Sequence, residues 1–335
     1  MATSDIIVIG GSTGAIDVLR TVCGGLRAGL PAAILAVVHL SHDSLNQLGR
    51  ILDESGPLPA ATAREGEPIE NGRIYVAPAG LHMLVTDRTV ALRRGPRENM
   101  ARPAIDPLFR SAALSHGPRV IGVLLSGRLN DGAAGLAAVK SCGGRAVVQD
   151  PDDALAPEMP RGALRTVAVD RCTPAANLAS VIAELAATPP GPALPVPPDL
   201  GLEVAIAAGG SIDSNVLRAF AEPAPLTCPD CGGVLSQVRA PGPLRFRCQV
   251  GHGFTGQVLA DKQEGAVDEA LRVALRIVEE RVELLARLAR NSEEAGQPAI
   301  AATYMARSQE YRDYAQTIRN AILSALAPLG EPAGR

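Results

Sequence analysis

Short runs of aliphatic residues alternate with amphipathic stretches along the first 187 residues. Runs of this length, bounded by turn residues, are typical of buried strands, and the stretches between them repeat apolar positions at helical spacing, as in residues 16–26. Such alternation predicts an α/β fold with a mainly parallel, doubly wound sheet. The expected strands are residues 6–9, 33–38, 74–76, 84–92, 120–125, 145–148 and 167–169.

The pattern changes after residue 188. Residues 189–200 are rich in proline and predict an extended, semi-rigid linker. Residues 264–290 and 300–327 again show apolar residues at helical spacing and predict a long αα-hairpin joined through residues 291–298. The apolar residues of each helix form a stripe along one face. The two stripes either pack against each other or, because two helices bury them incompletely, form a docking or dimerisation surface. We favour the second alternative, in which the hairpin is a targeting or assembly arm.

Composition narrows the class of protein. A chain of 335 residues suggests two or more domains. A net charge of −3 and a pI near 6.0 argue against bulk binding of nucleic acid. We find neither an apolar run of about 18 residues nor a signal-peptide pattern, so we expect a cytoplasmic protein without membrane insertion.

Ser12 lies in the segment Gly10-Gly11-Ser12-Thr13-Gly14, directly behind the first expected strand. The segment fits G-x-S-x-G, in which a sharp turn from strand to helix exposes the serine hydroxyl. It does not fit the dinucleotide motif G-x-G-x-x-G, because Ser12 takes the place of the second glycine. Alone, the motif is also compatible with a glycine-rich turn in which Ser12 caps a helix.

Two further residues favour a catalytic interpretation of Ser12. His39 ends the apolar run 33–38, and Asp131 follows the run 120–125. In a parallel sheet all three residues lie at the carboxyl edge, where open α/β folds bind ligands. A serine nucleophile needs a base, and the base needs a carboxylate to orient it. The chain order differs from that of familiar triads, which are recognised by geometry.

Residues 1 to about 188 resemble the catalytic domain of the chemotaxis receptor methylesterases, usually called CheB. The resemblance rests on these residues: residues 9–14 (IGGSTG), Val38-His39, residues 72–78 (GRIYVAP), His82-Met83, residues 102–106 (RPAID), Leu108-Phe109 and residues 130–135 (NDGAAG). It implies Ser12 as nucleophile, His39 as general base and Asp131 as orienting acid, with no cofactor needed for catalysis. The implied reaction hydrolyses glutamyl methyl esters on the cytoplasmic helices of a chemoreceptor, and some members also deamidate glutamine.

The resemblance also implies residues that support the active site and the oxyanion. These are Thr13, Arg128, Asn130, Arg102, His82 and Met83. His82 equally suits a buried structural histidine. Arg102 belongs to an arginine-rich loop with Arg93, Arg94 and Arg97, which either is a solvated loop or guides an acidic receptor helix.

The chain departs from the family in two places. Where the family usually has Gly-Met-Gly-Asn-Asp, this chain has Gly127-Arg128-Leu129-Asn130-Asp131. If that second glycine has a positive φ, Leu129 is strained by roughly 1–2 kcal/mol. Family members commonly carry an N-terminal receiver domain, whereas the first expected strand here begins near residue 5. We therefore expect no control by phosphorylation within this chain.

Four potential metal ligands follow the linker. Cys228-Pro229-Asp230-Cys231 forms a C-x-x-C turn, and Cys248 and His252 form a C-x-x-x-H pair. This spacing suits a tetrahedral, structural Zn²⁺ site in a zinc ribbon, with Gly232-Gly233 at the turn. A redox C-x-x-C pair would need a βαβ context and would leave Cys248 and His252 without a role.

These observations define four expected parts and two function classes. The parts are a CheB-type domain (1–188), a linker (189–200), a zinc-ribbon region (201–256) and a helical hairpin (262–327). The first function is hydrolysis of protein glutamate methyl esters. The alternative is a weakly active or non-catalytic scaffold that binds partners, or a second copy, through its zinc-ribbon and helical tail.

Overall fold

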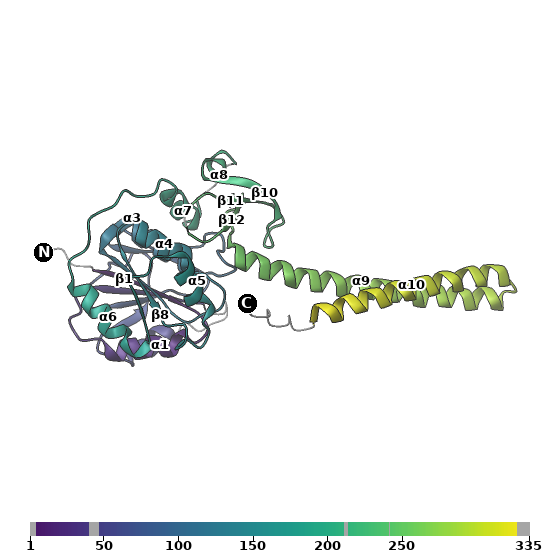
Figure 1. Ribbon diagram of the computed structural model, residues 1–335, viewed down its shortest axis with the longest axis horizontal. Coiled ribbons are helices and arrows are strands. Elements are labelled where there is room, and N and C mark those ends of the chain that lie inside the picture. The colour runs from purple at the N-terminus through teal and green to yellow at the C-terminus, as the bar shows by residue number, and fades with distance from the viewer. Residues whose placement is uncertain (1–4, 40–46, 211–213, 241, 327–335) are drawn as a thin grey trace, which may run out of the picture. The chain divides into compact units, whose positions relative to one another are not determined.

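A seven-stranded sheet, parallel in every pairing, forms the centre of the first part of the chain in the computed structural model (Figure 1). The structure describes residues 5–39, 47–210, 214–240 and 242–326. The strand order is β3-β4-β2-β1-β7-β8-β9, which confirms the expected doubly wound α/β fold. The strands are β1 (Ile6–Gly11), β2 (Ala33–Val38), β3 (Ala60–Thr62), β4 (Ile74–Val76), β7 (Val120–Leu124), β8 (Arg145–Gln149) and β9 (Arg171–Thr173).

Helices cover both faces of this sheet. Alternate residues of β1 point to opposite faces, so Ile6 and Val8 belong to one buried cluster and Ile7 and Ile9 to the other. The first cluster is covered by α3 (Ile105–His116), α4 (Ala133–Ser141) and α5 (Glu158–Thr166). The second is covered by α1 (Ala15–Gly25), α2 (Leu48–Asp53) and α6 (Ala175–Ala187).

Two expected strands differ in the structure. Residues 84–92 do not form one strand but belong to an antiparallel hairpin of β5 (His82–Thr86) and β6 (Thr89–Arg93), because the chain reverses at Asp87, where φ is 51°. The strand expected at residues 167–169 is found a few residues later, as β9 at Arg171–Thr173. Val167 ends α5, and its N–H donates to the carbonyl of Ala163. The apolar run that suggested a strand therefore packs at a helix end.

A smaller antiparallel sheet follows residues 189–199, which have no regular structure, and two short helices, α7 (Leu200–Ala207) and α8 (Ser214–Phe220). Its strands, in spatial order, are β10 (Ala221–Thr227), β11 (Val234–Val238), β12 (Arg245–Cys248) and β13 (Gly253–Thr255). We call these four strands the Cys/His sheet. The chain divides into two compact units, residues 1–259 and 260–335, so this sheet belongs to the unit of the parallel sheet.

A buried group of charges joins the Cys/His sheet and α7 to the parallel domain. Arg110 of α3 pairs with Glu98 and with Glu203 of α7. Arg247 of β12 reaches the same two carboxylates at 3.2 and 3.4 Å, and Arg245 lies 2.6 Å from Glu203. Burial alone would raise the pKa of Glu98, but Arg110 and Arg247 lower it to about 2. Because removing one partner would leave a buried unpaired charge, this group fixes the sheet in place.

The second unit consists of two long helices. α9 (Gly256–Glu294) begins in the first unit, directly after β13, and α10 (Pro298–Leu326) follows a short turn. α9 is longer than the expected helix at 264–290, and α10 lies close to the expected 300–327. Within the second unit, Ser308 donates to the carbonyl of Val282, and Arg281 lies 5.0 Å from the ring centre of Tyr311.

Among the residues that the structure describes, none of the helices is both long and apolar enough to span a membrane.

Close packing of α3 on α4 generates a prediction about stability. A Cβ added at Gly135 of α4 would lie 2.6 Å from the Cβ of Phe109 and 3.0 Å from the carbonyl oxygen of Asp106, neither of which can move alone. Gly135→Ala should therefore lower the free energy of unfolding by about 1–3 kcal/mol in urea titrations. Gly201→Ala is the matched control, because a Cβ there meets no atom within 4 Å. Equal stability of both variants would contradict the prediction.

Candidate functional site

Ser12 lies at the carboxyl end of β1, at the turn into α1. Its backbone N–H donates to the carbonyl of Ser126 at 2.9 Å, and its own carbonyl accepts the N–H of Ala15 at 3.0 Å. Gly14 precedes the helix with φ of 80°, which a residue with a Cβ rarely adopts. A Cβ added at Gly127 would lie 3.0 Å from the Cβ of Ser12. The serine is therefore held between two loops, and its side chain is partly exposed.

His39 directly follows β2 and Asp131 lies in the loop between β7 and α4, and both of these strands pair with β1. The backbone N–H of His39 donates to Gly11, the residue before Ser12, at 3.2 Å. Nε2 of His39 lies 2.7 Å from Oδ2 of Asp131, and the side chain of Asp131 is only 2% exposed. Since Nε2 faces the carboxylate, Nδ1 is the ring nitrogen left to exchange a proton with a substrate or with Ser12. These residues lie where the strand order reverses, between β1 and β7.

The Asp131 carboxylate is surrounded by donors. Besides His39, it accepts the backbone N–H of Ile105 at 2.7 Å and of Gly132 at 3.0 Å, and the side-chain amide of Asn99 at 2.8 Å. Burial would raise its pKa, but the hydrogen bond and charge of His39, with those from Ile105 and Asn99, lower it to about 2. Asp131 is therefore a charged, oriented acceptor for the histidine.

A second buried carboxylate, Asp106, lies next to Asp131. Oδ1 of Asp106 accepts the N–H of Gly135 at 2.6 Å, and Oδ2 accepts the amide of Asn99 at 3.1 Å. Burial, followed by the negative charge of Asp131, raises the pKa of Asp106 to about 7. Two adjacent buried carboxylates repel each other when both are charged, so one of them tends to hold a proton. That proton belongs on Asp106, because Asp131 accepts more hydrogen bonds.

Asn99 links the two carboxylates and was not identified from the sequence. Its Nδ2 donates to Asp106 and Asp131, while its Oδ1 accepts the backbone N–H of Thr255 at 2.8 Å. It lies in an arginine-rich loop for which a solvated segment was one of the two expectations. Nothing in the neighbouring sequence indicated that Asn99 itself is buried, with only 8% of its surface exposed.

A pocket of about 370 Å³ opens beside His39. Its walls come from residues 97 and 99–103, including Arg97 and Arg102. The guanidinium of Arg102 donates to the carbonyl of Gly95 at 2.9 Å. Burial, and then the charges of Arg97 and Arg94, lower the pKa of Arg102. Positive charge is therefore concentrated next to the histidine, which favours an acidic ligand.

The six expected support residues occupy different places. The carbonyl of Thr13 accepts the hydroxyl of Ser126 at 2.7 Å, Arg128 is exposed, and Asn130 is buried. His82 is fully buried, with Nε2 donating to Pro96 at 2.9 Å and Nδ1 accepting the N–H of Ala104 at 3.3 Å. Met83 belongs to the core of the parallel domain. His82 and Met83 thus brace the loop and the core rather than line the pocket.

Leu129 has a left-handed backbone, with φ of 60°. The sequence had identified this position as strained if φ were positive, and the structure confirms the sign. Its side chain packs against the buried cluster of the Cys/His sheet, as does that of Met100. The departure from glycine therefore coincides with a contact to the second sheet.

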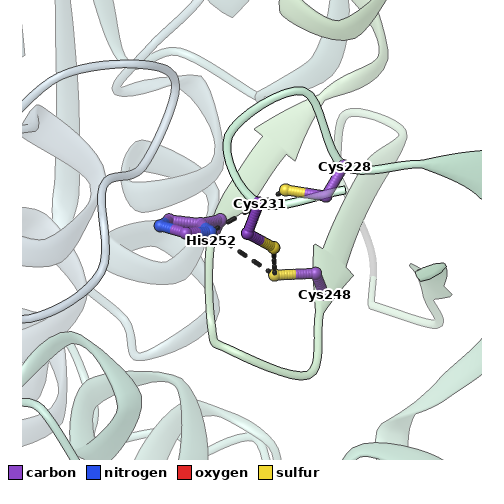
Figure 2. Close-up of side chains that lie close together, drawn as sticks. All are labelled: Cys228, Cys231, Cys248 and His252. Atoms are coloured by element: carbon purple, nitrogen blue, oxygen red, sulfur yellow. Dashed lines mark hydrogen bonds between the residues drawn. The ribbon is translucent and has the colours of Figure 1, made fainter. Parts of the chain in front are cut away.

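The four potential metal ligands converge in the Cys/His sheet. Cys228 and Cys231 lie in the turn after β10, Cys248 ends β12, and His252 precedes β13 (Figure 2). Their ligand atoms all lie within 4.8 Å of one another, with contacts of 3.6–3.8 Å between neighbours. Those contacts match the edges of a tetrahedron around Zn²⁺, about 3.5–3.8 Å for bonds of 2.0–2.3 Å. Nδ1 of His252 faces the sulfurs of Cys228 and Cys248, and its Nε2 lies 3.9 Å from Asp230.

A parallel α/β sheet that brings a serine, a histidine and an aspartate to the carboxyl ends of adjacent strands is of the class that includes the serine hydrolases. The model of the CheB methylesterase family matches residues 7–182, and the chain belongs to this family.

Individual relatives agree with this assignment. A putative protein-glutamate methylesterase/protein-glutamine glutaminase of Leptospira interrogans is 39% identical over 167 residues, which are 50% of this chain and 86% of the relative. A second such protein, from Methanospirillum hungatei, is 40% identical over 159 residues, which are 47% of this chain and 45% of the relative. The chain thus spans about half the length of that relative.

A solved structure matches the same part of the chain. The crystal structure of the Thermotoga maritima CheB methylesterase catalytic domain has a TM-score of 0.53 and 29% identity to this chain, and it covers 55% of this chain and 100% of its own length.

The raised pKa of Asp106 predicts an unusual pH dependence of stability. Because its folded pKa, about 7, lies above the ordinary 3.8, the folded state holds the proton more tightly than the unfolded state. Its stabilising contribution is therefore complete below about pH 4 and is lost as the pH rises through about 7. Compared with Asp106→Asn, the wild type should lose up to about 4 kcal/mol of unfolding free energy between pH 4 and pH 8 in urea titrations. A difference between the two proteins that stays constant with pH would contradict this prediction.

Proposed function

We propose that this protein hydrolyses glutamate methyl esters of proteins with Ser12 as nucleophile, His39 as general base and Asp131 as orienting acid. The observation that carries the proposal is the 2.7 Å contact of His39 with the buried, charged Asp131, one strand away from the exposed turn of Ser12. Relatives in several organisms are named protein-glutamate methylesterase/protein-glutamine glutaminase, which supports the same reaction.

The contact of His39 with Asp131 supports the following proton transfers. Ser12 Oγ attacks the ester carbonyl while Nδ1 of His39 takes the hydroxyl proton, since Nε2 faces Asp131. The imidazolium then gives that proton to the departing methoxide, which leaves as methanol. Water, activated by the same histidine, hydrolyses the acyl-enzyme to glutamate and free Ser12. With a glutamine substrate the leaving group is ammonia instead.

Backbone donors around Ser12 suit the oxyanion. In strand-to-helix serine turns the N–H after the nucleophile stabilises the developing charge, and here that donor belongs to Thr13. The loop of Arg128 adjoins Ser12 through Gly127, so the backbone N–H of Arg128 is our candidate for the second donor. Asn130 of this loop is held by the hydroxyl of Thr255.

The charge around the pocket supports an acidic protein substrate. Arg97 and Arg102 line the pocket beside His39, and Arg94 lies close enough to Arg102 to lower its pKa. The methylated cytoplasmic helices of a chemoreceptor present glutamates next to the ester, and these would pair with the arginines. A cytoplasmic enzyme acting on such helices needs no membrane insertion.

A scaffold with weak or no activity is the second candidate, and Leu129 favours it. A leucine with a positive φ in the oxyanion loop costs about 1–2 kcal/mol, which a purely catalytic loop would avoid with glycine. In this function the hairpin helices would bind a partner or a second copy through exposed apolar residues such as Ile277, Leu284 and Leu323.

Replacing Ser12 distinguishes the two functions. Ser12→Ala should abolish hydrolysis of an activated ester and of a methylated receptor fragment, because the nucleophile is lost. Its thermal unfolding should match that of the wild type, since only a partly exposed hydroxyl is removed. A serine-directed fluorophosphonate, followed by mass spectrometry, should label Ser12 in the wild type. An unlabelled wild type that hydrolyses neither ester would favour the scaffold.

We further propose that Cys228, Cys231, Cys248 and His252 hold one structural Zn²⁺ in a zinc ribbon. Burial raises the pKa of Cys228 to about 12, so a cation is needed to keep its sulfur as a thiolate. Four protein ligands leave no open position, so the metal stabilises the sheet and takes no part in the hydrolysis.

Metal content tests this site directly. Protein purified without added metal should contain about one Zn²⁺ per chain, with Zn–S bonds near 2.3 Å by X-ray absorption. Cys231→Ser should reduce zinc content and lower the thermal stability of the first unit. The control Cys172→Ser changes a cysteine outside the cluster, so its zinc content should be unchanged. Less than about half an equivalent of zinc in fresh, reduced wild type would contradict the proposal.

A further inference from the structure

We infer that the Cys/His sheet positions the catalytic aspartate, so that the hydrolase site is complete only when β13 is docked on the loops around Asp131. The inference rests on the proposed function, because it assigns a role within that active site. Three observations support it. They are two hydrogen bonds donated by Thr255, the positive φ values of three residues at this contact, and the buried ion group around Glu98.

The first hydrogen bond sets the direction of the Asn99 amide. The backbone N–H of Thr255 donates to Oδ1 of Asn99 at 2.8 Å. Because Oδ1 must face this donor, Nδ2 points the other way, toward Asp131 at 2.8 Å and Asp106 at 3.1 Å. With the amide flipped, a carbonyl oxygen would face the charged carboxylate of Asp131. Thr255 therefore fixes a donor to the carboxylate that orients His39.

The second hydrogen bond fixes the residue before Asp131. The hydroxyl of Thr255 donates to Oδ1 of Asn130 at 2.5 Å and accepts the N–H of Val258 at 3.3 Å. Thr255 thus caps the first turn of α9 and binds the loop of the catalytic aspartate with the same oxygen. Both partners are buried, with Thr255 1% and Asn130 7% exposed, so no bulk water replaces the bond.

Strained backbone is concentrated at the same contact. Asn99, Met100 and Leu129 have φ values of 51°, 64° and 60°, and they are three of the four non-glycine residues with positive φ that the structure describes. The fourth, Asp87, lies in a hairpin turn. Met100 and Leu129 pack on the buried cluster around Phe246 and Phe254. Burial against the sheet offsets the strain, so the loops hold this conformation because the sheet covers them.

The buried ion group holds the sheet at the required place. Glu98, the neighbour of Asn99, pairs with Arg247 of β12 at 3.2 Å and with Arg110 of the parallel domain. The backbone N–H of Asn99 donates to Gly253 at 2.8 Å, and the N–H of Gly253 donates to Arg97 at 3.2 Å. The loop and β13 are thus joined by main chain as well as by charge.

The catalytic consequence is specific. Without the bond from the Thr255 hydroxyl to Asn130, Asp131 is displaced and orients His39 less well, which slows the chemical step, while neither Thr255 nor Asn130 lines the substrate pocket. We therefore expect loss of this bond to lower kcat and leave KM within about twofold. This role belongs to the Cys/His sheet and not to the hairpin, and it adds to any function of the tail as an arm.

The test uses the full-length chain and a small activated ester. Thr255→Val keeps the backbone N–H but loses the hydroxyl, and should lower kcat about tenfold. Thr255→Ser restores the hydroxyl and should restore kcat. Val234→Thr is the control, because Val234 is an exposed residue of the same sheet, in β11, and should leave kcat unchanged.

Two further variants separate positioning from simple loss of stability. Asn130→Ala should lower kcat, and the double variant with Thr255→Val should be no slower than the slower single variant, because the two groups share one bond. Leu129→Gly relieves the positive φ but removes the contact with the sheet. If the sheet positions the loop, its kcat falls; if the sheet is irrelevant, its kcat is unchanged or rises.

The outcomes distinguish this inference from the proposed function. An inactive wild type, or Ser12→Ala with full activity, would overturn the proposed function and with it this inference. An active wild type whose Thr255→Val and Leu129→Gly variants keep full kcat would overturn the inference alone. If circular dichroism shows that Thr255→Val does not fold, Leu129→Gly takes its place. Its kcat and its rate of fluorophosphonate labelling at Ser12 are then compared with those of the wild type, and unchanged values would overturn the inference.

Discussion

A carboxylate as deeply buried as that of Asp131 keeps its charge only if hydrogen-bond donors replace the water it has lost. Ile105, Gly132 and Asn99 supply those donors together with His39. Each of these donors belongs to a different segment, so the start of α3, the loop before α4, the loop of Asn99 and the end of β2 must all meet at one point. The candidate active site therefore depends on the relative positions of four segments of the domain.

The loop of residues 97–101 connects this constraint to a second one. Glu98 faces the buried arginines, while the next residue, Asn99, faces the carboxyl groups of Asp106 and Asp131. The ion group around Glu98 contains residues from α3, α7 and β12, and it cannot lose one member without leaving an unpaired buried charge. Movement of the Cys/His sheet would thus displace Glu98 through Arg247, and with it the adjacent Asn99. A small sheet with few core residues can in this way affect a site that it does not line.

The periodicity of the sequence was sufficient for five strands of the parallel sheet (β1, β2, β4, β7 and β8) and for the long helices, because each depends on a local pattern of apolar residues. It missed the short edge strand β3 and misplaced β9. The antiparallel hairpin at residues 82–93 was predicted as a single strand, because its turn at Asp87 and Arg88 contains neither glycine nor proline. The convergence of Cys228, Cys231, Cys248 and His252 followed from spacing alone. Asn99 and Thr255 could not be found in this way, since they are 156 positions apart and their contact exists only when the Cys/His sheet is packed on the parallel domain.

Leu129 shows how one residue can look unfavourable in the sequence and reasonable in the structure. For the domain alone, a leucine with φ of 60° costs about 1–2 kcal/mol and gains nothing that glycine lacks. With the Cys/His sheet in place, its side chain is partly buried against an apolar cluster, and burying a leucine contributes about 1.5–3 kcal/mol when complete. The two terms are of similar size, so the loop conformation depends on the sheet for its stability. Leu129, which departs from the usual sequence of the family in the loop before Asp131, therefore also connects that loop to the Cys/His sheet.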